Sequence, residues 1–538
     1  MSRTYLSTTV LLALTVLCSS FRLGDPPSNF DFSDLTQDAS PTEAAWVNER
    51  YHAMSLEERI GQLMNIRAHS DKGAAHEQEV AQLIQKYHVG GLTFFQGTPE
   101  KQIELTNRYQ QLTKRVPLMI AMDAEWGVGM RFKEKTVNYP YQLMLGAIQD
   151  NRLIYDMGVA VAQQFKQLGM HVNFAPVADV NNNAANPVIN FRSFGEDRYN
   201  VAVKTYMYTK GMQDSGILAC AKHFPGHGDT DVDSHLDLPV IPHQRARLDS
   251  IELLPFRIMA QQGVGSMMVA HLHVPTLDAT PNRPTTLSSA AVTNLLKEEL
   301  AYKGLIFTDG LGMKGVTKHY APGEVEAAAI VAGNDVMLLP ESVPAAFSSI
   351  KAYLKSGKIS DARLAESVKK ILRAKYRLGI RTFTPLSATG VRSALNSASS
   401  RVLKRKLIAH GLTLVRDEPQ LLPISELEDL SIASLAIGAK RNNAFQERLS
   451  RYKTMPQLRM DKNASSSEQQ RIIEQLEGRQ KVIVSLHDMS QYASKDFGIT
   501  SATRSLLRQL NEQHELILVI LGNPYALKYF DDYKTVLV

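Results

Sequence analysis

Short apolar segments alternate with amphipathic segments over residues 41–381 of the chain. The apolar segments are bounded by glycine or polar residues, and the amphipathic ones repeat their hydrophobic positions at helical spacing. Strands that alternate with helices predict a parallel sheet. The eight strands expected from the pattern are Gln62–Ile66, Gly91–Phe95, Pro117–Met122, Val172–Ala178, Ile217–Ala221, Ser266–Ala270, Leu305–Thr308 and Asp335–Leu339.

Eight strand–helix units of this kind fit an α/β fold, the (β/α)8 barrel of the TIM type; a doubly wound open sheet is the structural alternative. Ionisable residues favour the barrel, because they directly follow five successive strands. In barrels the functional site lies at the carboxyl ends of the strands. The residues in question are Asp123, Asp179, the segment that starts at Lys222, the pair His271 and His273, and Asp309.

A second α/β region follows the barrel pattern. Residues 382–400 are rich in Ser, Thr, Ala and Pro and predict a linker. Residues 401–538 carry strand-like runs at 432–437, 482–486 and 516–521, with helical runs between them. The last residues, 535–538, resemble a strand cut at its end. We therefore expect the second domain to be incomplete and the chain to be a piece of a longer protein.

The amino terminus has the pattern of a secretory signal in residues 1–20, followed by a polar tether in residues 21–40. Arg3 precedes a short apolar run that ends in Leu17-Cys-Ser-Ser20. The pattern predicts export to the periplasm or the cell envelope. Cys18 also allows a lipoprotein reading, although Leu17 is bulkier than a lipidation motif normally tolerates. After cleavage only Cys220 would remain, which excludes a disulfide framework.

Composition narrows the functional classes. Hydrophobic residues make up 44% of the chain and charged residues 21%, as in ordinary globular proteins. The net charge of +6 is spread over helical segments without a dense basic cluster, so nucleic acid is not an expected partner. The chain contains no GxSxG, GxGxxG or GxxxxGK[ST] motif, which argues against serine hydrolases, dinucleotide enzymes and P-loop enzymes. No cofactor is predicted.

The segment 222–235, KHFPGHGDTDVDSH, is the strongest candidate for a catalytic loop. Asp233 and His235 stand two residues apart, so the carboxylate can orient the imidazole as a general acid/base. Lys222 and His223 are expected to leave the preceding strand first and to donate hydrogen bonds to substrate hydroxyls from deep in the site. A polar surface loop is the plainer alternative. A metal site that also uses His271 and His273 is a further one, but the eighth strand ends without an acid and no metal is predicted.

Two other strand ends carry candidate chemistry. Asp309 lies between an apolar strand and a glycine-rich segment, which suits a nucleophile that must approach a carbon atom closely; capping of the next helix is the alternative. Asp123 opens the segment DAEWGVGMR, whose carboxylate, indole and guanidinium (Arg131) suit sugar binding. The indole of Trp126 suits either a stacking role or the core. Arg192 adds a second fixed fork of donors.

Together these segments resemble glycoside hydrolase family 3, in particular its bacterial β-N-acetylglucosaminidase branch. The motifs that carry the resemblance are KHFPGHGDTDVDSH, FTDGLGMKG, AGNDVMLLP and NFAPVADV. It covers about residues 45–380 and, more weakly, 400–538, which look like the front of the family's αβα-sandwich domain. Two features depart from the family pattern: DAEWGVGMR stands in place of a glycine-rich DQEGG form, and the second domain stops early.

The resemblance implies a retaining glycosidase. Asp309 would be the nucleophile and the pair Asp233 and His235 the acid/base. The amino sugar would be held by Asp123, Arg131, Arg192, Lys222 and His223, with His271 lining the pocket.

The implied activity is the exo-acting removal of terminal N-acetylglucosamine from peptidoglycan fragments or chitooligosaccharides. A β-glucosidase or β-xylosidase of the same family is the alternative enzyme. A phosphorolytic variant is another, because a neutral histidine repels an anionic acceptor less than a carboxylate does. A catalytically silent carbohydrate-binding protein of the envelope is the alternative outside the enzymes. The expected partner is a GlcNAc-containing oligosaccharide or muropeptide, with a membrane tether only if Cys18 is lipidated.

Overall fold

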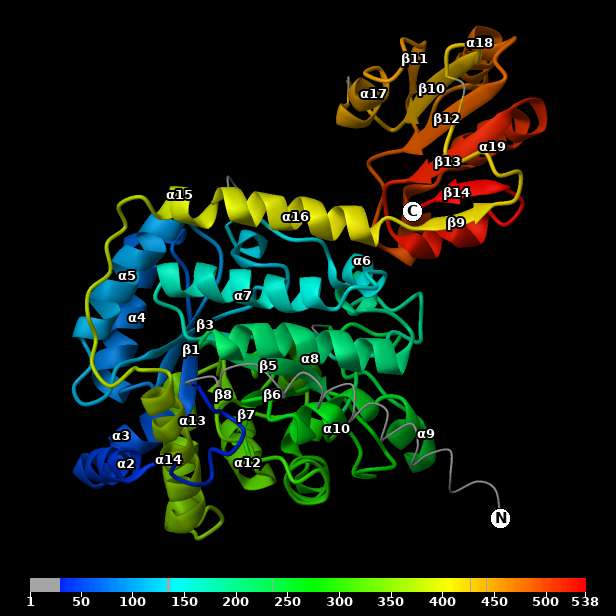
Figure 1. Ribbon diagram of the computed structural model, residues 1–538. Helices are drawn as coiled ribbons and strands as arrows, with labels where there is room; N and C mark the ends of the chain where they lie inside the picture. Colours follow the sequence, from blue (N-terminus) through cyan, green and yellow to red (C-terminus); the bar gives the residue numbers. More distant parts are fainter. Residues whose placement is uncertain (1–29, 133–135, 235, 426, 442) are drawn as a thin grey trace.

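The computed structural model describes residues 30–538 except 133–135, 235, 426 and 442. Within that part, two sheets organise the chain, an eight-stranded parallel one and a six-stranded mixed one (Figure 1). The signal pattern of residues 1–20 and residues 21–29 of the predicted tether lie outside the described residues. Within them, no helix combines the length and the apolar character that crossing a membrane requires.

The first sheet is the predicted barrel. Its strands follow the ring order β7-β6-β5-β4-β3-β2-β1-β8, and a bridge between Phe307 and Val336 joins the two ends. The α/β barrel prediction is therefore confirmed, and the doubly wound alternative is wrong. The strands are β1 (Met64–Ala68), β2 (Gly91–Phe94), β3 (Met119–Met122), β4 (Val172–Asn173), β5 (Leu218–Phe224), β6 (Ser266–Val269), β7 (Leu305–Thr308) and β8 (Met337–Leu338).

Helices surround this ring, and several begin at side-chain caps that the sequence supplies. Ser55 and Glu58 form a reciprocal capping box, and Thr98 caps a helix that opens with a proline. The barrel helices are α2 (Pro41–Ala53), α3 (Leu56–Gln62), α4 (Gly73–Tyr87), α5 (Pro99–Gln111), α6 (Gln142–Gly146), α7 (Arg152–Gln167), α8 (Arg198–Asp214), α9 (Arg245–Ser250), α10 (Leu254–Gln261), the π-helix η4 (Ala290–Glu299), α11 (Lys314–Thr317), α12 (Glu324–Ala332), α13 (Val343–Lys355) and α14 (Asp361–Arg377).

The two faces of each strand can be assigned from contacts and register. The Asn173 amide of β4 donates to Met212 Sδ on α8, so Asn173 faces the helices. Its register partner on β3 is Met122, which therefore also faces outward. Ala121 consequently faces the barrel interior, as does Asp123 two residues later. The strand pattern thus aims Asp123 into the mouth of the barrel.

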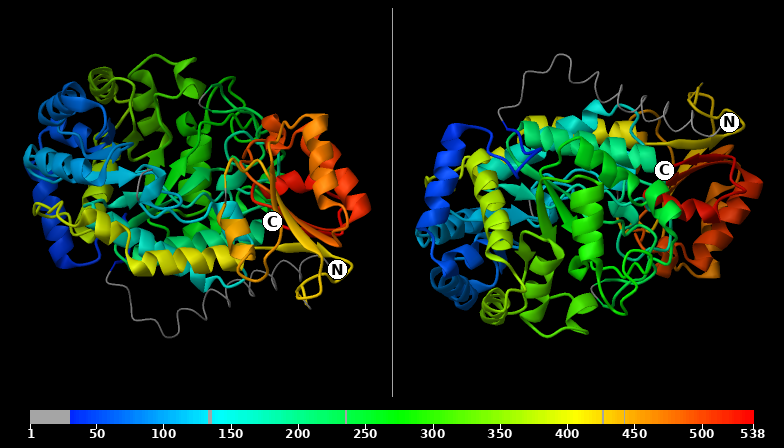
Figure 2. Two further views of the ribbon diagram at one scale, coloured as in Figure 1. Left: turned by 90° about the horizontal axis from the view of Figure 1, so that it is seen from above. Right: turned by 90° about the horizontal axis from the view of Figure 1, so that it is seen from below.

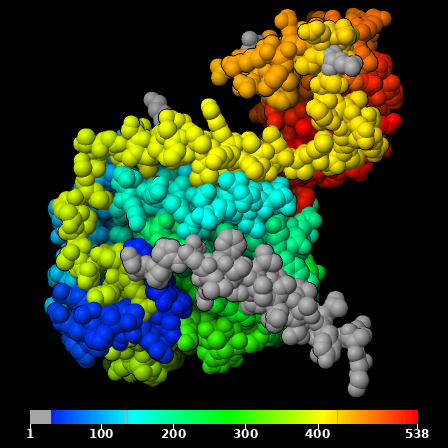
Figure 3. Space-filling view, in the orientation of Figure 1, coloured from blue at the N-terminus to red at the C-terminus, as the bar shows by residue number. Residues whose placement is uncertain are grey.

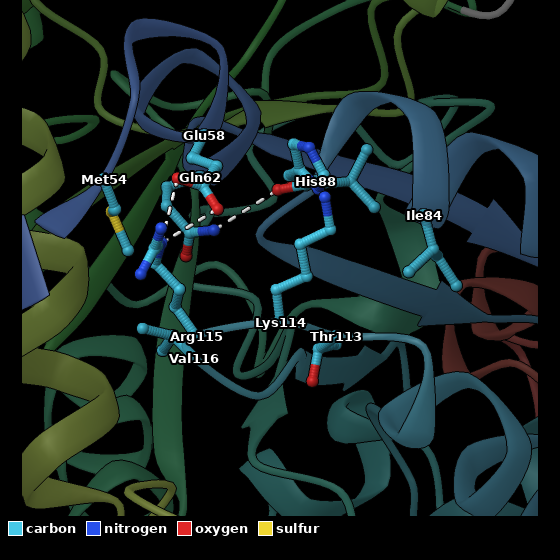
Figure 4. A pocket seen from close by; sticks show the side chains of 10 residues that line it. Met54, Glu58, Gln62, Ile84, His88, Thr113, Lys114, Arg115 and Val116 are labelled. Atoms are coloured by element: carbon cyan, nitrogen blue, oxygen red, sulfur yellow. Dashed lines mark hydrogen bonds and ion pairs between the residues drawn. The ribbon is translucent and has the colours of Figure 1, made fainter.

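The amino ends of the strands are closed by buried polar contacts. A small pocket there is lined by residues that precede β1, β2 and β3, and Arg115 crosses it to Glu58 at 3.0 Å (Figure 4). Residues 31–38 also lie at this end, because Arg373 of α14 donates to Asp38 at 2.7 Å. Polar groups at the amino end of a barrel serve stability rather than chemistry.

The second sheet follows α15 (Val391–Leu395) and α16 (Ala398–Gly411), so the segment predicted as a linker contains α15 and the start of α16. Helix α16 runs along α7 and leads into the second sheet, which stands out from the barrel (Figures 1 and 3). The strand order is β11-β10-β12-β13-β14-β9, with only β9 antiparallel to its neighbour. The strands are β9 (Leu414–Asp417), β10 (Ile432–Ile437), β11 (Gln457–Met460), β12 (Lys481–Leu486), β13 (Glu515–Ile520) and β14 (Thr535–Leu537).

Helices cover both faces of this sheet, as the two buried clusters on its opposite sides show (Figure 2). The larger cluster joins the sheet to α18 (Ser466–Leu476) and α19 (Ser501–Gln513), and the smaller one joins it to α17 (Ala444–Leu449). The layers are therefore α, β and α. The strand that the sequence showed as cut at its end, β14, lies between β13 and β9 inside the sheet.

Candidate active site

Five charged side chains form one connected network at the carboxyl ends of β3 and β5. Lys222 Nζ lies 2.9 Å from an oxygen of both Asp123 and Glu125. Arg131 Nη2 lies 2.7 Å from the other oxygen of Asp123. Arg192 donates two hydrogen bonds to the carboxylate of Glu125, of 2.7 and 3.0 Å. The loop after β3 therefore holds two acids, and three cations from separate segments meet on them.

The network keeps both acids ionised. Burial opposes the ionisation of Glu125, but Arg192 and Lys222 outweigh it and hold the pKa of that carboxyl well below its ordinary value. Burial likewise opposes ionisation of Asp123, and Lys222 and Arg131 lower its pKa overall. In return, the two acids overcome the burial of Lys222 and raise its pKa. The donors are thus charged and fixed before any ligand arrives.

Glu125 was not predicted as a site residue. It is fully buried and contacts two predicted residues, Arg192 and Lys222. The signal that could have found it is its place two residues after Asp123 in the same strand-end segment. An acid so near a predicted cluster of cations is expected to form an ion pair. Its burial, however, could not be predicted from the neighbouring residues in the sequence.

The prediction that the fifth strand ends before Lys222 is wrong, because β5 continues through Phe224. The register between β5 and β6 shifts between Ala221 and Phe224, so the polar residues occupy an irregular end of the strand. Their side chains are satisfied inside the barrel, which removes the usual cost of polar residues in a buried strand. Lys222 and His223 are therefore held by the sheet itself.

Asp179 organises the start of the candidate loop. Its carboxylate lies 2.7 Å from His223 Nδ1 and accepts the backbone N–H of His223 and of His227. Burial opposes the ionisation of Asp179, and His223 together with these donors lowers its pKa. Asp179 thus fixes the orientation of the His223 imidazole through its Nδ1 atom.

The rest of the candidate loop is held by short polar contacts. Gly228 passes so close to the Val180 carbonyl that a Cβ would lie 1.8 Å from its oxygen, which only glycine permits. The buried ring of His227 contacts Thr230 Oγ1 at 2.8 Å and Ser234 Oγ at 3.2 Å. Burial lowers the pKa of His227 to about 4, so the ring is neutral at pH 7.

Asp233 lies next to Ser234 in this anchored segment, whereas His235 lies outside the described residues. The Ser234 carbonyl accepts the backbone N–H of Gly315 at 3.2 Å, which ties the loop to the segment after Asp309. The Asp233–His235 dyad stays a prediction.

Asp309 directly follows β7 and faces the barrel mouth. Its backbone N–H donates to the Val269 carbonyl at 2.9 Å, and one of its carboxylate oxygens accepts the Gly310 N–H at 2.7 Å. His271 is fully buried beside this turn, where its Nε2–H donates to the Gly310 carbonyl at 3.0 Å. The carboxylate is therefore held in a fixed rotation, as a nucleophile requires. The predicted pocket-lining role of His271 remains a prediction.

One group of side chains among the described residues has the spacing of a metal site. Asp229, His243 and Glu252 bring ligand atoms within 4.8 Å of one another. Arg247 already occupies this group, because its Nη2 lies 3.4 Å from Asp229 and 3.1 Å from Glu252. A guanidinium between two carboxylates supplies the positive charge that a cation would bring, so this group does not support a metal site.

An aromatic group lies beside the network and includes a residue of the second domain. Trp126 meets Tyr141 edge to face at 4.8 Å between centroids, and Tyr141 contacts Phe191 at 4.7 Å. Tyr492 of the second domain approaches Phe191 at 6.3 Å. Trp126 is half-buried, so it is neither a core residue nor fully available for stacking.

Hydrogen bonds join the two domains at the same place. Tyr525 Oη lies 2.8 Å from Asn181 Nδ2, and Asn523 Nδ2 donates to Asn190 Oδ1 at 2.6 Å. Both barrel residues belong to the loop after β4. The same loop reaches the candidate catalytic loop through Asn186, whose amide donates to the carbonyls of His227 and Gly228.

This arrangement coincides with a known family. The model described as "Glycosyl hydrolase family 3 N terminal domain" matches residues 55–374, which is more than half of the chain. The chain belongs to glycoside hydrolase family 3. The family match covers β1 to β8, and with them every candidate residue described above.

Individual family 3 relatives extend this finding. The chain is 32% identical over 381 residues to "Beta-hexosaminidase A" of Pseudoalteromonas piscicida, covering 65% of this chain and 62% of that protein. The chain thus spans less than two-thirds of that relative's length. It is 28% identical to "Beta-N-acetylglucosaminidase/beta-glucosidase" of Cellulomonas fimi, over 71% of this chain and 68% of that protein.

A solved structure covers both domains. The family 3 β-N-acetylglucosaminidase from Paenibacillus sp. str. FPU-7 is similar with a TM-score of 0.76 and 29% sequence identity. The match covers 90% of this chain and 93% of that one. The order of barrel, connecting helix and α/β second domain is therefore shared with that relative.

Proposed function

We propose that this family 3 protein is a retaining, exo-acting β-N-acetylglucosaminidase. The observation that carries the proposal is the charged network at the barrel mouth, formed by Asp123, Glu125, Lys222 and Arg192. Asp309 lies at the same mouth, after β7. Fixed carboxylates and cations suit the hydroxyl groups of a terminal sugar, because each hydroxyl both donates and accepts a hydrogen bond. The names of the Cellulomonas and Paenibacillus relatives include a β-N-acetylglucosaminidase, which supports an N-acetylated amino sugar.

In the proposed reaction, a carboxylate oxygen of Asp309 attacks the anomeric carbon and forms a covalent glycosyl-enzyme. The bond from that carbon to the leaving oxygen breaks, and the acid/base supplies the proton that the oxygen takes up. Water then attacks the same carbon, returns a proton to the acid/base and releases Asp309. The dyad Asp233–His235 is the acid/base in this proposal, on the sequence motif alone.

For the natural substrate we propose peptidoglycan fragments or chitooligosaccharides, met after export to the periplasm or cell envelope. Both carry β-linked N-acetylglucosamine at a non-reducing end. This choice rests on the signal pattern of residues 1–20 and on the family. A β-glucosidase is the second candidate, because the name of the Cellulomonas relative includes that activity.

The test is the initial rate on an aryl β-N-acetylglucosaminide and on the matching aryl β-glucoside. We expect turnover of the amino sugar, and a loss of at least about a thousandfold in kcat for Asp309→Ala because the covalent step is removed. Asp361→Ala, an exposed acid on α14, is the matched control and should keep the wild-type rate. Turnover of the glucoside alone would replace the first candidate with the second. Sugar 1-phosphate formed on addition of phosphate would mark the reaction as phosphorolytic.

A further inference from the structure

Arg67 is the one exposed residue of β1, and it lies at the carboxyl end of the strand. Its guanidinium forms no ion pair or hydrogen bond with the described residues. It packs against the ring of Phe95. An arginine is always charged, and one that lines a pocket without an acid presents a cation to whatever enters. Arg67 is not among the site residues predicted from the sequence.

Register places Arg67 on the inner face of the barrel. Arg67 pairs with Thr93 on β2, and Thr93 pairs with Ala121 on β3. Ala121 faces the interior, and register partners in a sheet point to the same side. Arg67 therefore faces the barrel mouth on the side that also carries Asp123.

The ring of Phe95 lies between Arg67 and Arg131, a member of the charged network. The guanidinium carbon of Arg67 lies 5.0 Å from the ring centroid and that of Arg131 lies 4.9 Å from it. His69 stacks on the same ring at 5.2 Å with an interplanar angle of 20°. A guanidinium packed on an aromatic ring keeps its N–H groups available at its edge, where they can bind an anion.

Among the described residues, the charges at the mouth leave Arg67 without a counter-ion. Arg131 is neutralised by Asp123 and Arg192 by Glu125, while Lys222 is shared by the two acids. Asp309 directly follows β7, which is two strands away from β1 in the ring. The corner formed by Arg67, Phe95 and Arg131, here called the basic corner, therefore adds positive charge to the barrel mouth beside a network whose own ions are paired with one another.

We propose that the basic corner binds an anionic ester group on the terminal amino sugar, so that the enzyme accepts N-acetylglucosamine carrying a sulfate or phosphate on its primary hydroxyl. A tetrahedral oxyanion matches the fork of guanidinium donors, and an ester on the primary hydroxyl extends furthest from the sugar ring, because that hydroxyl is carried on an exocyclic carbon. The inference rests on the proposed function, since it names a substrate class for the same pocket.

The experiment compares kcat/KM for three aryl β-N-acetylglucosaminides: the unsubstituted sugar, its 6-O-sulfate and its 6-O-phosphate. For the wild type we expect at least one ester to be used as efficiently as the unsubstituted sugar. Arg67→Gln should lower the ratio of ester to unsubstituted kcat/KM by about 10- to 100-fold, the usual range for a lost charge-assisted hydrogen bond. Arg67→Lys should restore part of the ratio, because it returns the charge without the planar fork.

Lys101→Gln provides the matched control, since it removes one positive charge from the outer surface of α5 and should leave the ratio unchanged. The wild-type ratio should also fall as salt rises. A higher kcat/KM for the sulfate or for the phosphate shows which ester the basic corner prefers, and a preference for either ester supports the inference. The inference is overturned if the wild type uses the unsubstituted sugar but neither ester, or if Arg67→Gln lowers all three rates equally.

A binding measurement separates this inference from the proposed function. If no aryl glycoside is turned over, the proposed function fails, and thermal shifts with N-acetylglucosamine 6-sulfate and 6-phosphate still test the basic corner. Stabilisation by either ester that exceeds that by N-acetylglucosamine and is lost in Arg67→Gln supports the anion site. Equal shifts in wild type and Arg67→Gln overturn it.

Discussion

At the carboxyl end of the barrel, Asp123, Glu125 and Lys222 form ion pairs at the barrel mouth. At the amino end, Asp335 and Lys370 form one that is fully enclosed. The carboxylate of Asp335 lies 2.6 Å from Lys370 Nζ, accepts Ser367 Oγ–H at 2.6 Å and accepts the backbone N–H of Ile306. This pair holds α14 against β7 and the start of β8. Both ends therefore concentrate buried charge, but for different purposes.

The two networks differ in how completely their charged groups are paired within the protein and shielded from solvent. At the amino end the oxygens of Asp335 meet protein donors, and neither Asp335 nor Lys370 is more than 1% exposed. At the carboxyl end the side chain of Asp123 keeps 22% exposure, and Arg67 is exposed with no acid paired to it in the part of the chain that the structure describes. A dense ion-pair network is thus a poor marker of a site by itself. Residual exposure at the strand ends is the better marker.

The largest effect should come from breaking the enclosed pair. Lys370→Met leaves Asp335 buried without its cation, so we expect the free energy of unfolding to fall by about 3–5 kcal/mol in urea denaturation. Adding Asp335→Asn to this variant should recover part of the loss, because the unpaired charge is removed. Unchanged kcat/KM per folded molecule is expected in both. A loss below about 1 kcal/mol would contradict the assignment of this end to stability.

A smaller effect, and one on activity, should follow from Glu125→Gln. Lys222 and Arg192 each lose a counter-charge, so we expect kcat/KM for the aryl amino sugar to fall about 10- to 100-fold. Because Glu125 helps to raise the pKa of Lys222, the alkaline decline of activity should also begin at a lower pH. Glu104→Gln, on the surface of α5, is the control. A uniform loss of activity without a change in the pH profile would indicate a purely structural role.

The effect that is smallest near neutral pH, and that grows only on acidification, concerns one buried histidine at each end. Burial lowers the pKa of His171, before β4, to about 3 and that of His227, in the candidate loop, to about 4. Both take up a proton near pH 6.5 only when unfolded, so stability should fall as pH drops from 6.5 towards 4. The expected slope is about 1.4 kcal/mol per pH unit for each histidine. His171→Gln and His227→Gln should each remove one share of the slope in urea titrations at several pH values.

Apolar runs predicted the barrel well, because its strands are buried on both faces and read as continuous hydrophobic segments. The same rule missed β9 and β11, whose residues are mostly exposed or half-buried at the two edges of the second sheet. It also ended β5 too early, since Lys222 and His223 are polar residues whose burial depends on partners elsewhere in the chain.

Candidate site residues were found where they directly follow a strand, as Asp123 and Asp309 do. Glu125 and Arg67 were missed, because their roles depend on which face of the barrel they occupy and on charges supplied by other strands. Spacing along one segment does not contain that information. It emerges only when the ring closes and sets separate strand ends side by side.

The contacts between the domains give the second sheet a mechanical connection to catalysis. Asn523 and Tyr525 hold the asparagine-rich loop after β4, and Asn186 of that loop holds the backbone of the candidate catalytic loop. Ser234 then joins that loop to the segment behind Asp309. The α/β domain therefore supports the loops that carry the predicted nucleophile and acid/base. We expect its removal to loosen the alignment of these groups, even though it contributes none of them.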